Sequence, residues 1–196
     1  MTRLPALAGL LLFAAAATAQ TPEPTPLPLA DRPLTVADGS SLTLGAAAGP
    51  EGLVVLFWST TCPWAERYAD RVSEVVAGYV PAGVGVVVVT AGGAADARDV
   101  PAATRRRPAA SALTVPYVVD ADGSLAAAFG ARNAPHAFFF GPDRTLVYDG
   151  AIDDSPADRD RVQVPYLQQA LDQSIAGIPV EVMKTQAFGC TIGARP

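Results

Sequence analysis

Short apolar runs alternate with amphipathic stretches along the middle of the chain. Leu53–Trp58 is a continuous apolar run rich in β-branched and aromatic side chains, which predicts a strand buried on both faces. In Pro63–Tyr79 the apolar residues recur every three or four positions, which predicts an amphipathic helix. The opposite face of this helix carries five charged residues, namely Glu66, Arg67, Asp70, Arg71 and Glu74. Residues 83–90 are a second apolar run of strand length, so the order is strand, helix, strand.

Weaker patterns extend this order towards both ends of the chain. Residues 34–37 and 41–44 flank Asp38-Gly39, which predicts a small N-terminal hairpin. The later elements, in chain order, are a weak Ala-rich helix, a short strand, the two strands of a hairpin and a closing helix, at residues 96–112, 115–119, 137–141, 145–148 and 166–176. Together they predict an α/β domain with a mixed central β-sheet, helices on both faces and a C-terminal extension.

The start of the chain differs from the rest in composition. Arg3 precedes an apolar run at residues 4–17, and Ala17-Thr18-Ala19 is a small-x-small cleavage site. This pattern predicts a secretory signal peptide over residues 1–19, cleaved after Ala19, and an exported, periplasmic or secreted protein. The run is shorter than the roughly 20 residues that span a bilayer, so a membrane anchor is the weaker alternative. No later run exceeds strand length, and no stable membrane span is expected.

Two further segments follow the signal peptide. Residues 20–33 contain five prolines and predict an extended, poorly ordered linker. Residues 34–196 are long enough for one domain with a hydrophobic core and too short for two of the usual size. We therefore expect a single domain over this range.

The charge balance argues against a nucleic-acid partner. The chain has 14 Lys and Arg residues against 19 Asp and Glu, a net charge of −5, and loss of Arg3 with the signal peptide makes it more negative. The basic cluster at residues 105–107 precedes a proline and is interpreted as a solvated loop or helix end. Four carboxylates lack the spacing of a calcium-binding loop and are interpreted as a solvated acidic loop, namely Asp153, Asp154, Asp158 and Asp160.

The two cysteines carry most of the chemical information. Cys62 and Cys190 are the only cysteines of a chain that is expected in an oxidising compartment. They could form a permanent bridge that fixes the C-terminal tail, a catalytic pair that opens and closes, or a lone reactive thiol at Cys62. The residues alone leave these alternatives open. Metal delivery would need two cysteines close in sequence, so neither a metal nor another cofactor is expected.

Cys62 lies where the first buried strand meets the amphipathic helix. Pro63 suits the first helical position, which would make Cys62 the N-cap residue. A thiol at this place faces unpaired backbone N–H groups and the positive end of the helix dipole, and both favour the thiolate. A nucleophilic sulfur is the consequence.

The same junction carries a family resemblance. Residues 57–64 read FWSTTCPW, and an aromatic pair followed by Cys-Pro at the start of a helix resembles the active-site turn of thioredoxins. The resemblance implies a thioredoxin-like three-layer fold with Cys62 as the nucleophilic cysteine. Ala65 stands where thioredoxins carry their second cysteine, so dithiol exchange confined to a C-x-x-C motif is excluded.

A second stretch extends the resemblance. Residues 130–140 read GARNAPHAFFF and are similar to the segment in which a cis-proline of thioredoxin-like proteins opens the last hairpin and lies against the active cysteine. The resemblance implies a cis bond between Ala134 and Pro135 and places His136 near Cys62. An imidazole there could assist thiolate formation or proton delivery, and an unpaired hairpin histidine is the alternative.

The C-terminal part resembles the redoxin subfamily described as AhpC/TSA or peroxiredoxin-like. Residues 148–154 read YDGAIDD and residues 188–192 read FGCTI, which places Cys190 on the cysteine of a Gly-Cys-x-Ile element. The peroxidase motif of true peroxiredoxins is only half present. Ser59 matches its hydroxyl position, whereas Val55 stands in the place of its proline.

The hypothesis that follows is an exported thiol-dependent oxidoreductase of the redoxin type. Cys62 would attack a protein disulfide or a peroxide, and Cys190 would resolve the product with electrons from an unknown reductant. Peroxide reduction would give the protein an antioxidant activity. The residues expected to support the site are Ser59, Thr61, Pro63, Trp64, Arg132, Ala134, Pro135 and His136. The alternative is a non-catalytic binding or structural module with a permanent Cys62–Cys190 disulfide.

Overall fold

A mixed five-stranded sheet forms the centre of the computed structural model, which describes residues 23–90 and 115–193. The strands lie in the order β5-β4-β3-β7-β8, and their bounds are β3 Leu53–Trp58, β4 Gly85–Thr90, β5 Tyr117–Val119, β7 His136–Phe140 and β8 Leu146–Gly150. β3, β4 and β5 are parallel, whereas β7 is antiparallel to β3 and β8 is antiparallel to β7. The predicted mixed sheet is confirmed.

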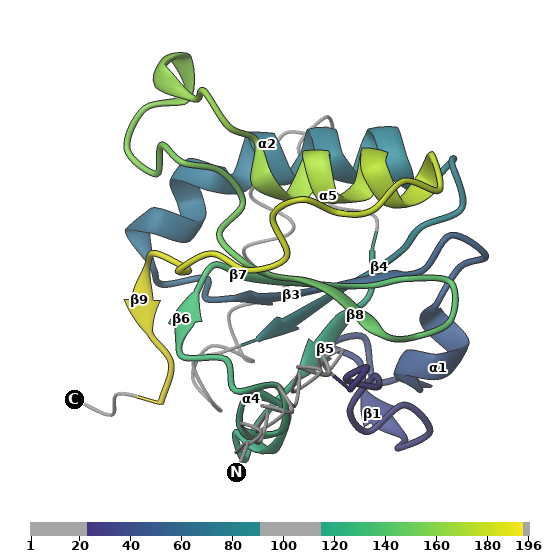
Figure 1. The fold of residues 1–196 in the computed structure, drawn as a ribbon. Coiled ribbons are helices and arrows are strands. Elements are labelled where there is room, and N and C mark those ends of the chain that lie inside the picture. The colour runs from purple at the N-terminus through teal and green to yellow at the C-terminus, as the bar shows by residue number, and fades with distance from the viewer. Residues whose placement is uncertain (1–22, 91–114, 194–196) are drawn as a thin grey trace, which may run out of the picture.

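Helices cover both faces of this sheet (Figure 1). α2 (Pro63–Tyr79) and α5 (Tyr166–Ile175) lie on one face, and the short helices α1 (Leu44–Ala47) and α4 (Ser124–Phe129) lie on the other. Alternate residues of each strand point to the two layers, so that Phe139 packs under α2 and α5 while its neighbours on β7 pack on the opposite side. The three-layer α/β architecture predicted from the sequence is confirmed.

Two pairs of short strands and a 3-10 helix complete the described part of the fold. The N-terminal hairpin, β1 (Leu34–Thr35) with β2 (Ser41–Leu42), forms as predicted. A two-stranded sheet of β6 (Asn133–Ala134) and β9 (Cys190–Thr191) was not predicted, because two-residue strands leave no periodic pattern. The 3-10 helix η2 (Arg159–Arg161) lies in the loop before α5. The helix predicted over residues 96–112 lies outside the described residues.

Local signals account for the two elements that lead to the cysteine. β3 and α2 have the bounds that the apolar pattern predicts. Pro63 is the first residue of α2, where its missing N–H removes no hydrogen bond, and Cys62 precedes it as the N-cap residue. The sequence therefore places Cys62 by purely local rules.

The proline-rich segment is better ordered than predicted. The Leu27 N–H donates to the Arg144 carbonyl at 2.9 Å, and the Leu146 N–H donates to the Thr25 carbonyl at 2.8 Å. Leu27 is buried in the core. The prediction of a poorly ordered linker was wrong for these residues, because prolines at alternate positions leave the backbone groups between them free to pair with the hairpin after β7.

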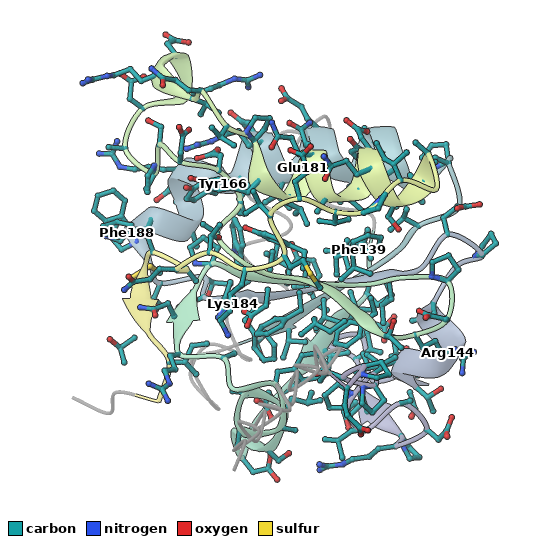
Figure 2. The ribbon with its side chains drawn as sticks, in the orientation of Figure 1. Phe139, Arg144, Tyr166, Glu181, Lys184 and Phe188 are labelled. Atoms are coloured by element: carbon teal, nitrogen blue, oxygen red, sulfur yellow. A yellow bond between two sulfur atoms is a disulfide. The ribbon has the colours of Figure 1, made fainter. Side chains whose placement is uncertain are left out.

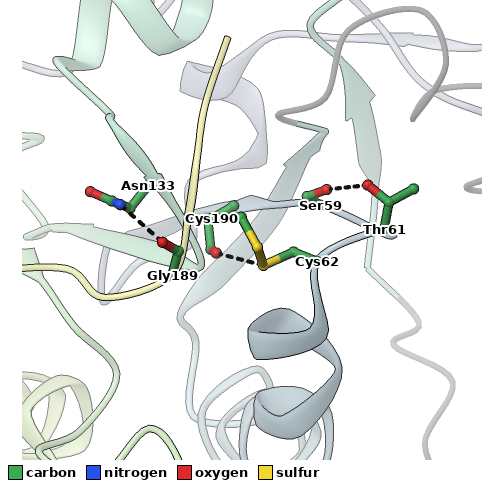
Figure 3. The surroundings of a disulfide bond; sticks show 7 residues. Ser59, Thr61, Cys62, Asn133, Gly189 and Cys190 are labelled. Carbon is green, nitrogen blue, oxygen red and sulfur yellow. Dashed lines mark hydrogen bonds between the residues drawn. A yellow bond between two sulfur atoms is a disulfide. The ribbon is translucent and has the colours of Figure 1, made fainter. Parts of the chain in front are cut away.

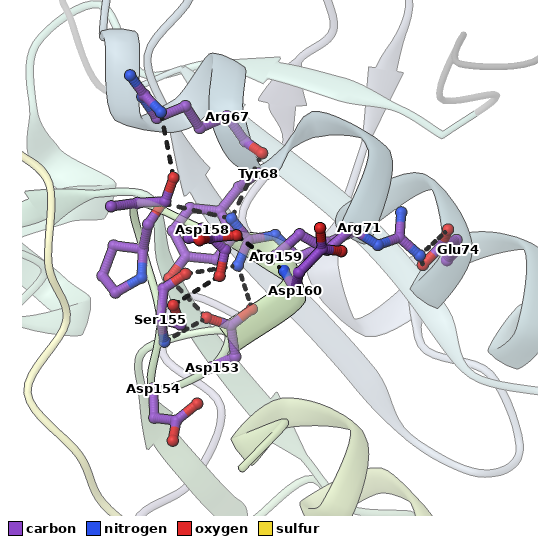
Figure 4. Close-up of polar contacts among 12 residues, drawn as sticks. Arg67, Tyr68, Arg71, Glu74, Asp153, Asp154, Ser155, Asp158, Arg159 and Asp160 are labelled. Atoms are coloured by element: carbon purple, nitrogen blue, oxygen red, sulfur yellow. Dashed lines mark hydrogen bonds and ion pairs between the residues drawn. The ribbon is translucent and has the colours of Figure 1, made fainter. Parts of the chain in front are cut away.

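A buried ion pair joins α2 to the loop that follows β8 (Figure 4). Arg71 Nη1 lies 2.5 Å from Asp153 Oδ2, and both residues are buried. The Tyr68 hydroxyl donates to Asp153 Oδ1 at 3.0 Å, and burial raises the pKa of this phenol so that it stays protonated. Arg71 also donates to the Ser155 carbonyl at 2.9 Å. These partners offset the desolvation of the two charges.

This ion pair corrects one interpretation of the charge pattern. The pattern places Arg71 among the charged residues of α2, and it is buried; the interpretation of Asp153 as part of a solvated acidic loop was wrong. The partners are 82 residues apart, so no local pattern reveals that they neutralise each other. The other carboxylates of the loop are exposed as predicted, namely Asp154, Asp158 and Asp160.

The described residues contain neither a candidate membrane-spanning helix nor a cluster of metal-binding side chains. In residues 23–90 and 115–193, no helix combines the length and the apolar character needed to cross a membrane. Over the same ranges, no group of three or more His, Cys, Asp and Glu side chains is arranged to hold a metal ion.

Candidate active site

Cys62 and Cys190 form a disulfide bond (Figure 3). Their Cα atoms are 5.9 Å apart, although 128 residues separate them in the sequence. Cys62 is only 3% exposed and belongs to the core cluster between the sheet and the helices α2 and α5. Cys190 is partly exposed on strand β9. The hypothesis of a lone Cys62 thiol does not fit this pairing.

The N-terminus of α2 is the first feature that shapes the chemistry of Cys62. The helix is 17 residues long, and no side chain caps its first turn. Cys62 donates its backbone N–H to the Ser59 carbonyl at 3.3 Å and accepts from Glu66 N at 3.2 Å through its own carbonyl. The unpaired N–H groups of the first turn and the helix dipole favour negative charge on a sulfur at this place.

The loop before β7 is the second feature that shapes the chemistry of Cys62. The Ala134–Pro135 peptide bond is cis, as the resemblance implied. The Ala134 carbonyl oxygen lies 3.3 Å from Cys62 Sγ. A disulfide sulfur carries no proton, so this approach is a van der Waals contact in the oxidised protein. In the reduced protein the same oxygen can accept a hydrogen bond from the thiol.

The C-terminal tail reaches this loop as an added strand. β9 pairs antiparallel with β6, so that Ala134 faces Cys190 and Asn133 faces Thr191. The Asn133 amide donates to the Gly189 carbonyl at 3.2 Å, and the Ile192 N–H donates to the Arg132 carbonyl at 2.8 Å. The cysteine of the tail is therefore held next to Cys62 by backbone pairing as well as by the disulfide.

A second contact fixes the tail upstream of the cysteine. The Thr185 N–H donates to the Asp149 carbonyl at 3.0 Å. The Thr185 hydroxyl accepts from Ala151 N at 2.9 Å and lies 2.6 Å from the Tyr148 hydroxyl. This anchor leaves only four residues between Thr185 and Cys190. Sequence reasoning missed it, because a single threonine in a polar stretch gives no signal.

Gly189 permits the close approach of the tail. A Cβ at this position would lie 2.0 Å from the Ala134 carbonyl oxygen, which is a backbone atom and cannot swing aside. Only glycine fits immediately before Cys190 in this arrangement. The Gly-Cys element noted in the sequence thus has a steric cause.

Two aromatic side chains flank the disulfide. Trp64 follows Cys62 by two residues, and Phe188 precedes Cys190 by two. Their rings pack edge to face with centroids 4.7 Å apart, and Phe188 is 48% exposed. Figure 2 shows Phe188 at the outer end of the tail, beside the start of α2. An exposed apolar surface therefore borders the disulfide.

His136 lies on the other side of the sheet. Its ring stacks on Phe138 at 4.3 Å, and its register partner on β3 is Phe57. Both phenylalanines belong to the core cluster opposite to the one that contains Cys62. Its hydrogen-bond partner is Asp149 Oδ1, at 2.6 Å from Nε2, rather than the Cys62 sulfur. The alternation of a strand directs this residue away from the cysteine despite its place after Pro135.

The remaining expected residues do not converge on the sulfur. The Ser59 hydroxyl lies 3.1 Å from the hydroxyl of Thr61, and Thr61 is exposed. Arg132 is also exposed, and its described contact with the tail is made by its backbone. Val55 is fully buried within β3. Among the described contacts, none joins the Ser59 hydroxyl or the Arg132 side chain to the Cys62 sulfur.

Solved structures of similar shape define the class of the fold. A hypothetical protein from Sinorhizobium meliloti 1021 has a TM-score of 0.75 at 28% identity, over 86% of this chain and 93% of that one. An uncharacterized conserved protein from Geobacillus kaustophilus has 0.74 at 26%, over 89% and 95%. A putative thiol:disulfide interchange protein DsbE from Chlorobium tepidum has 0.57 at 18%, over 78% and 96%, which shows the fold alone. The fold is thioredoxin-like.

Within this class the family is also shown. Residues 27–149 match the model of the AhpC/TSA family, and the chain belongs to that family. The match begins inside the proline-rich segment and ends before the tail that carries Cys190. A comparison with curated proteins found no match. The family, the fold and the Cys62–Cys190 disulfide together support a thiol-disulfide oxidoreductase in general terms.

The contact at Gly189 gives a first prediction. In Gly189→Ala the added methyl group would collide with the Ala134 carbonyl and push β9 away from β6. We expect the equilibrium constant for forming the disulfide in a glutathione redox buffer to fall about tenfold, or about 1.4 kcal/mol. Gly78→Ala is the matched control, because a Cβ there meets no atom within 4 Å. Equal equilibrium constants for disulfide formation in the two variants would contradict the steric role of Gly189.

Asp149 gives a second prediction. Burial alone raises the pKa of this carboxyl, but hydrogen bonds from His136 and Lys184 outweigh it and hold the pKa below its ordinary value. The carboxylate therefore stabilises the fold above its unfolded pKa of about 3.9, and this contribution is lost as the pH falls through the lower folded value.

Denaturant unfolding of the oxidised protein measures this effect. Asp149→Asn should be less stable than the wild type at pH 5 by about 2 kcal/mol, because His136 and Lys184 lose their hydrogen bonds to a carboxylate. The difference should shrink when both are measured at pH 3. A difference that stays constant between these two pH values would refute the assignment.

Proposed function

We propose that this chain is an exported thiol-disulfide oxidoreductase in which Cys62 is the nucleophile and Cys190 is the resolving cysteine. The observation that carries the proposal is the bond between a cysteine at the N-terminus of α2 and a cysteine on the tail strand. Reduction of this bond frees a sulfur at a place that favours the thiolate. The tail with Cys190 can then leave the surface of Cys62.

The reaction follows thiol-disulfide exchange. The Cys62 thiolate attacks one sulfur of a substrate disulfide, which forms a mixed disulfide and releases the other substrate sulfur as a thiolate. Cys190 then attacks Cys62 Sγ, which releases the second substrate thiolate and restores the Cys62–Cys190 bond. Two electrons pass from the protein to the substrate. The Thr185 anchor supports the second step, because it keeps Cys190 within a short chain of the mixed disulfide.

Disulfides are favoured over peroxides as the substrate. The Ser59 hydroxyl is engaged with Thr61, and Arg132 is exposed. A peroxidase needs such groups at the sulfur to orient the peroxide and to stabilise the departing oxygen. Peroxide reduction and an antioxidant role therefore rank second.

A structural disulfide is the competing proposal from a different class. Cys62 is almost completely buried, as a permanent bridge would be. In the chain-entropy model a bridge across 128 residues contributes about 5 kcal/mol of stability, which is enough to explain its presence without catalysis. The cysteine variants described next distinguish a structural disulfide from a catalytic one.

Cysteine variants test the proposed activity. With dithiothreitol as the electron donor, the wild type should accelerate the reduction of insulin disulfides, whereas Cys62→Ser should fall to the rate of dithiothreitol alone. Cys190→Ser should accumulate a mixed disulfide with the substrate on Cys62, because the resolving sulfur is missing. Insulin reduction that survives in Cys62→Ser would exclude Cys62 as the nucleophile.

Ser59→Ala is the control that separates the two substrates. It should keep the insulin activity of the wild type, since the Ser59 hydroxyl has no part in disulfide exchange. Hydrogen peroxide should be consumed slowly by both proteins. Fast peroxide consumption that is lost in Ser59→Ala would instead support the peroxidase.

Export is proposed from the leader and from the redox chemistry. Residues 1–19 have the pattern of a signal peptide, and a disulfide persists in oxidising compartments. Expression of the full chain in a bacterium should deliver a mature protein that begins at Gln20 to the periplasm or the medium. N-terminal sequencing checks this, and an uncleaved chain recovered in the cytoplasm would contradict it.

A further inference from the structure

The two sulfurs of the disulfide differ in their access to solvent. Cys62 is 3% exposed, and its sulfur touches the Ala134 carbonyl and packs into the core cluster beneath α2 and α5. Cys190 is partly exposed, and its strand β9 pairs with β6 alone among the described strands. In thiol-disulfide exchange the attacking sulfur approaches along the extension of the S–S bond. Because Cys62 is almost fully buried, an attacking sulfur has little access to it, whereas the partly exposed Cys190 on β9 can be reached.

The two sulfurs also differ as leaving groups. A disulfide opens faster when the sulfur that leaves is the more stable thiolate. Cys62 would leave at the N-terminus of a 17-residue helix, where the dipole and free N–H groups stabilise negative charge. Cys190 lies on a two-residue strand that offers no helix terminus. Access and leaving-group stability therefore both favour attack on the sulfur of Cys190.

We propose that the thiol that re-reduces the oxidised protein attacks Cys190, so that Cys62 is the leaving group and the donor's mixed disulfide forms on the tail. This assignment rests on the proposed function. It implies that the substrate and the electron donor react with different sulfurs. The substrate disulfide meets Cys62 when the tail is released, and the electron donor meets Cys190 when the tail covers Cys62.

The electron balance of the step is complete. A donor thiolate attacks Cys190 Sγ, the S–S bond breaks, and its electron pair stays on Cys62 as a thiolate. A second donor thiolate then attacks the donor sulfur of the mixed disulfide, which forms the oxidised donor and releases Cys190 as a thiolate that takes a proton from water. Two donor thiols are oxidised to one disulfide, and one protein disulfide is reduced to two thiols.

Glutathione can be used as the donor to test the site of attack. The oxidised protein is mixed with excess reduced glutathione, quenched at successive early times with N-ethylmaleimide and digested with trypsin. Cleavage after Lys184 yields the C-terminal peptide of residues 185–196, which contains Cys190 and not Cys62, because Pro196 blocks cleavage after Arg195. Mass spectrometry then counts glutathione and maleimide on each cysteine, and extrapolation to zero time removes any later transfer between the two sulfurs.

We expect glutathione on Cys190 and maleimide on Cys62 in about tenfold excess over the reverse pattern, which corresponds to a barrier difference of about 1.4 kcal/mol. A smaller thiol, 2-mercaptoethanol, should give a lower excess, because the contribution of access shrinks with the size of the donor. Glutathione mainly on Cys62, or equal labelling of both cysteines, would overturn the proposal. If the insulin activity is present, that result leaves the proposed function intact, whereas a disulfide that no thiol opens would contradict the function itself.

Discussion

The antiparallel pairing of β9 with β6 is the contact on which the candidate site depends. It brings a cysteine from the C-terminal tail against the N-terminus of α2, although the two cysteines are 128 positions apart in the sequence. The pairing is possible because Gly189 lets the two backbones approach and because the Asn133 amide binds the Gly189 carbonyl. Thr185 holds the tail from the other side. The tail therefore carries Cys190 and also lies against Cys62.

In the proposed function, the two thiols of the site come from two separate parts of the molecule. Ala65 stands in the place of the usual second cysteine on α2, and in the proposed function Cys190 supplies this second thiol from strand β9. Cys62 is nearly buried at the N-terminus of α2, whereas Cys190 is partly exposed on the tail. This difference between the environments of Cys62 and Cys190 is the basis of the proposed order of attack on the disulfide.

The sequence predicted those parts of the molecule that local rules determine. The spacing of apolar residues predicts β3 and α2, and Pro63 predicts that Cys62 is the N-cap residue. The family resemblance added the cis bond before Pro135. What it missed depends on partners distant in the chain. The pairing of β6 with β9, the buried Arg71–Asp153 pair and the Thr185 anchor have no local signature. His136 was placed near Cys62 by its neighbour in sequence, whereas the alternation of β7 directs it to Asp149 on the other face.

The reduction potential of the Cys62–Cys190 pair is the most direct test of the central claim that this disulfide is catalytic. It is measured by equilibrating the native protein with glutathione or dithiothreitol buffers and counting free thiols. A redox-active pair should titrate reversibly as one two-electron step, with a midpoint between about −120 and −270 mV, the range of known exchange proteins. A midpoint below about −300 mV, or reduction only when the protein unfolds, would show a structural bridge and contradict the account.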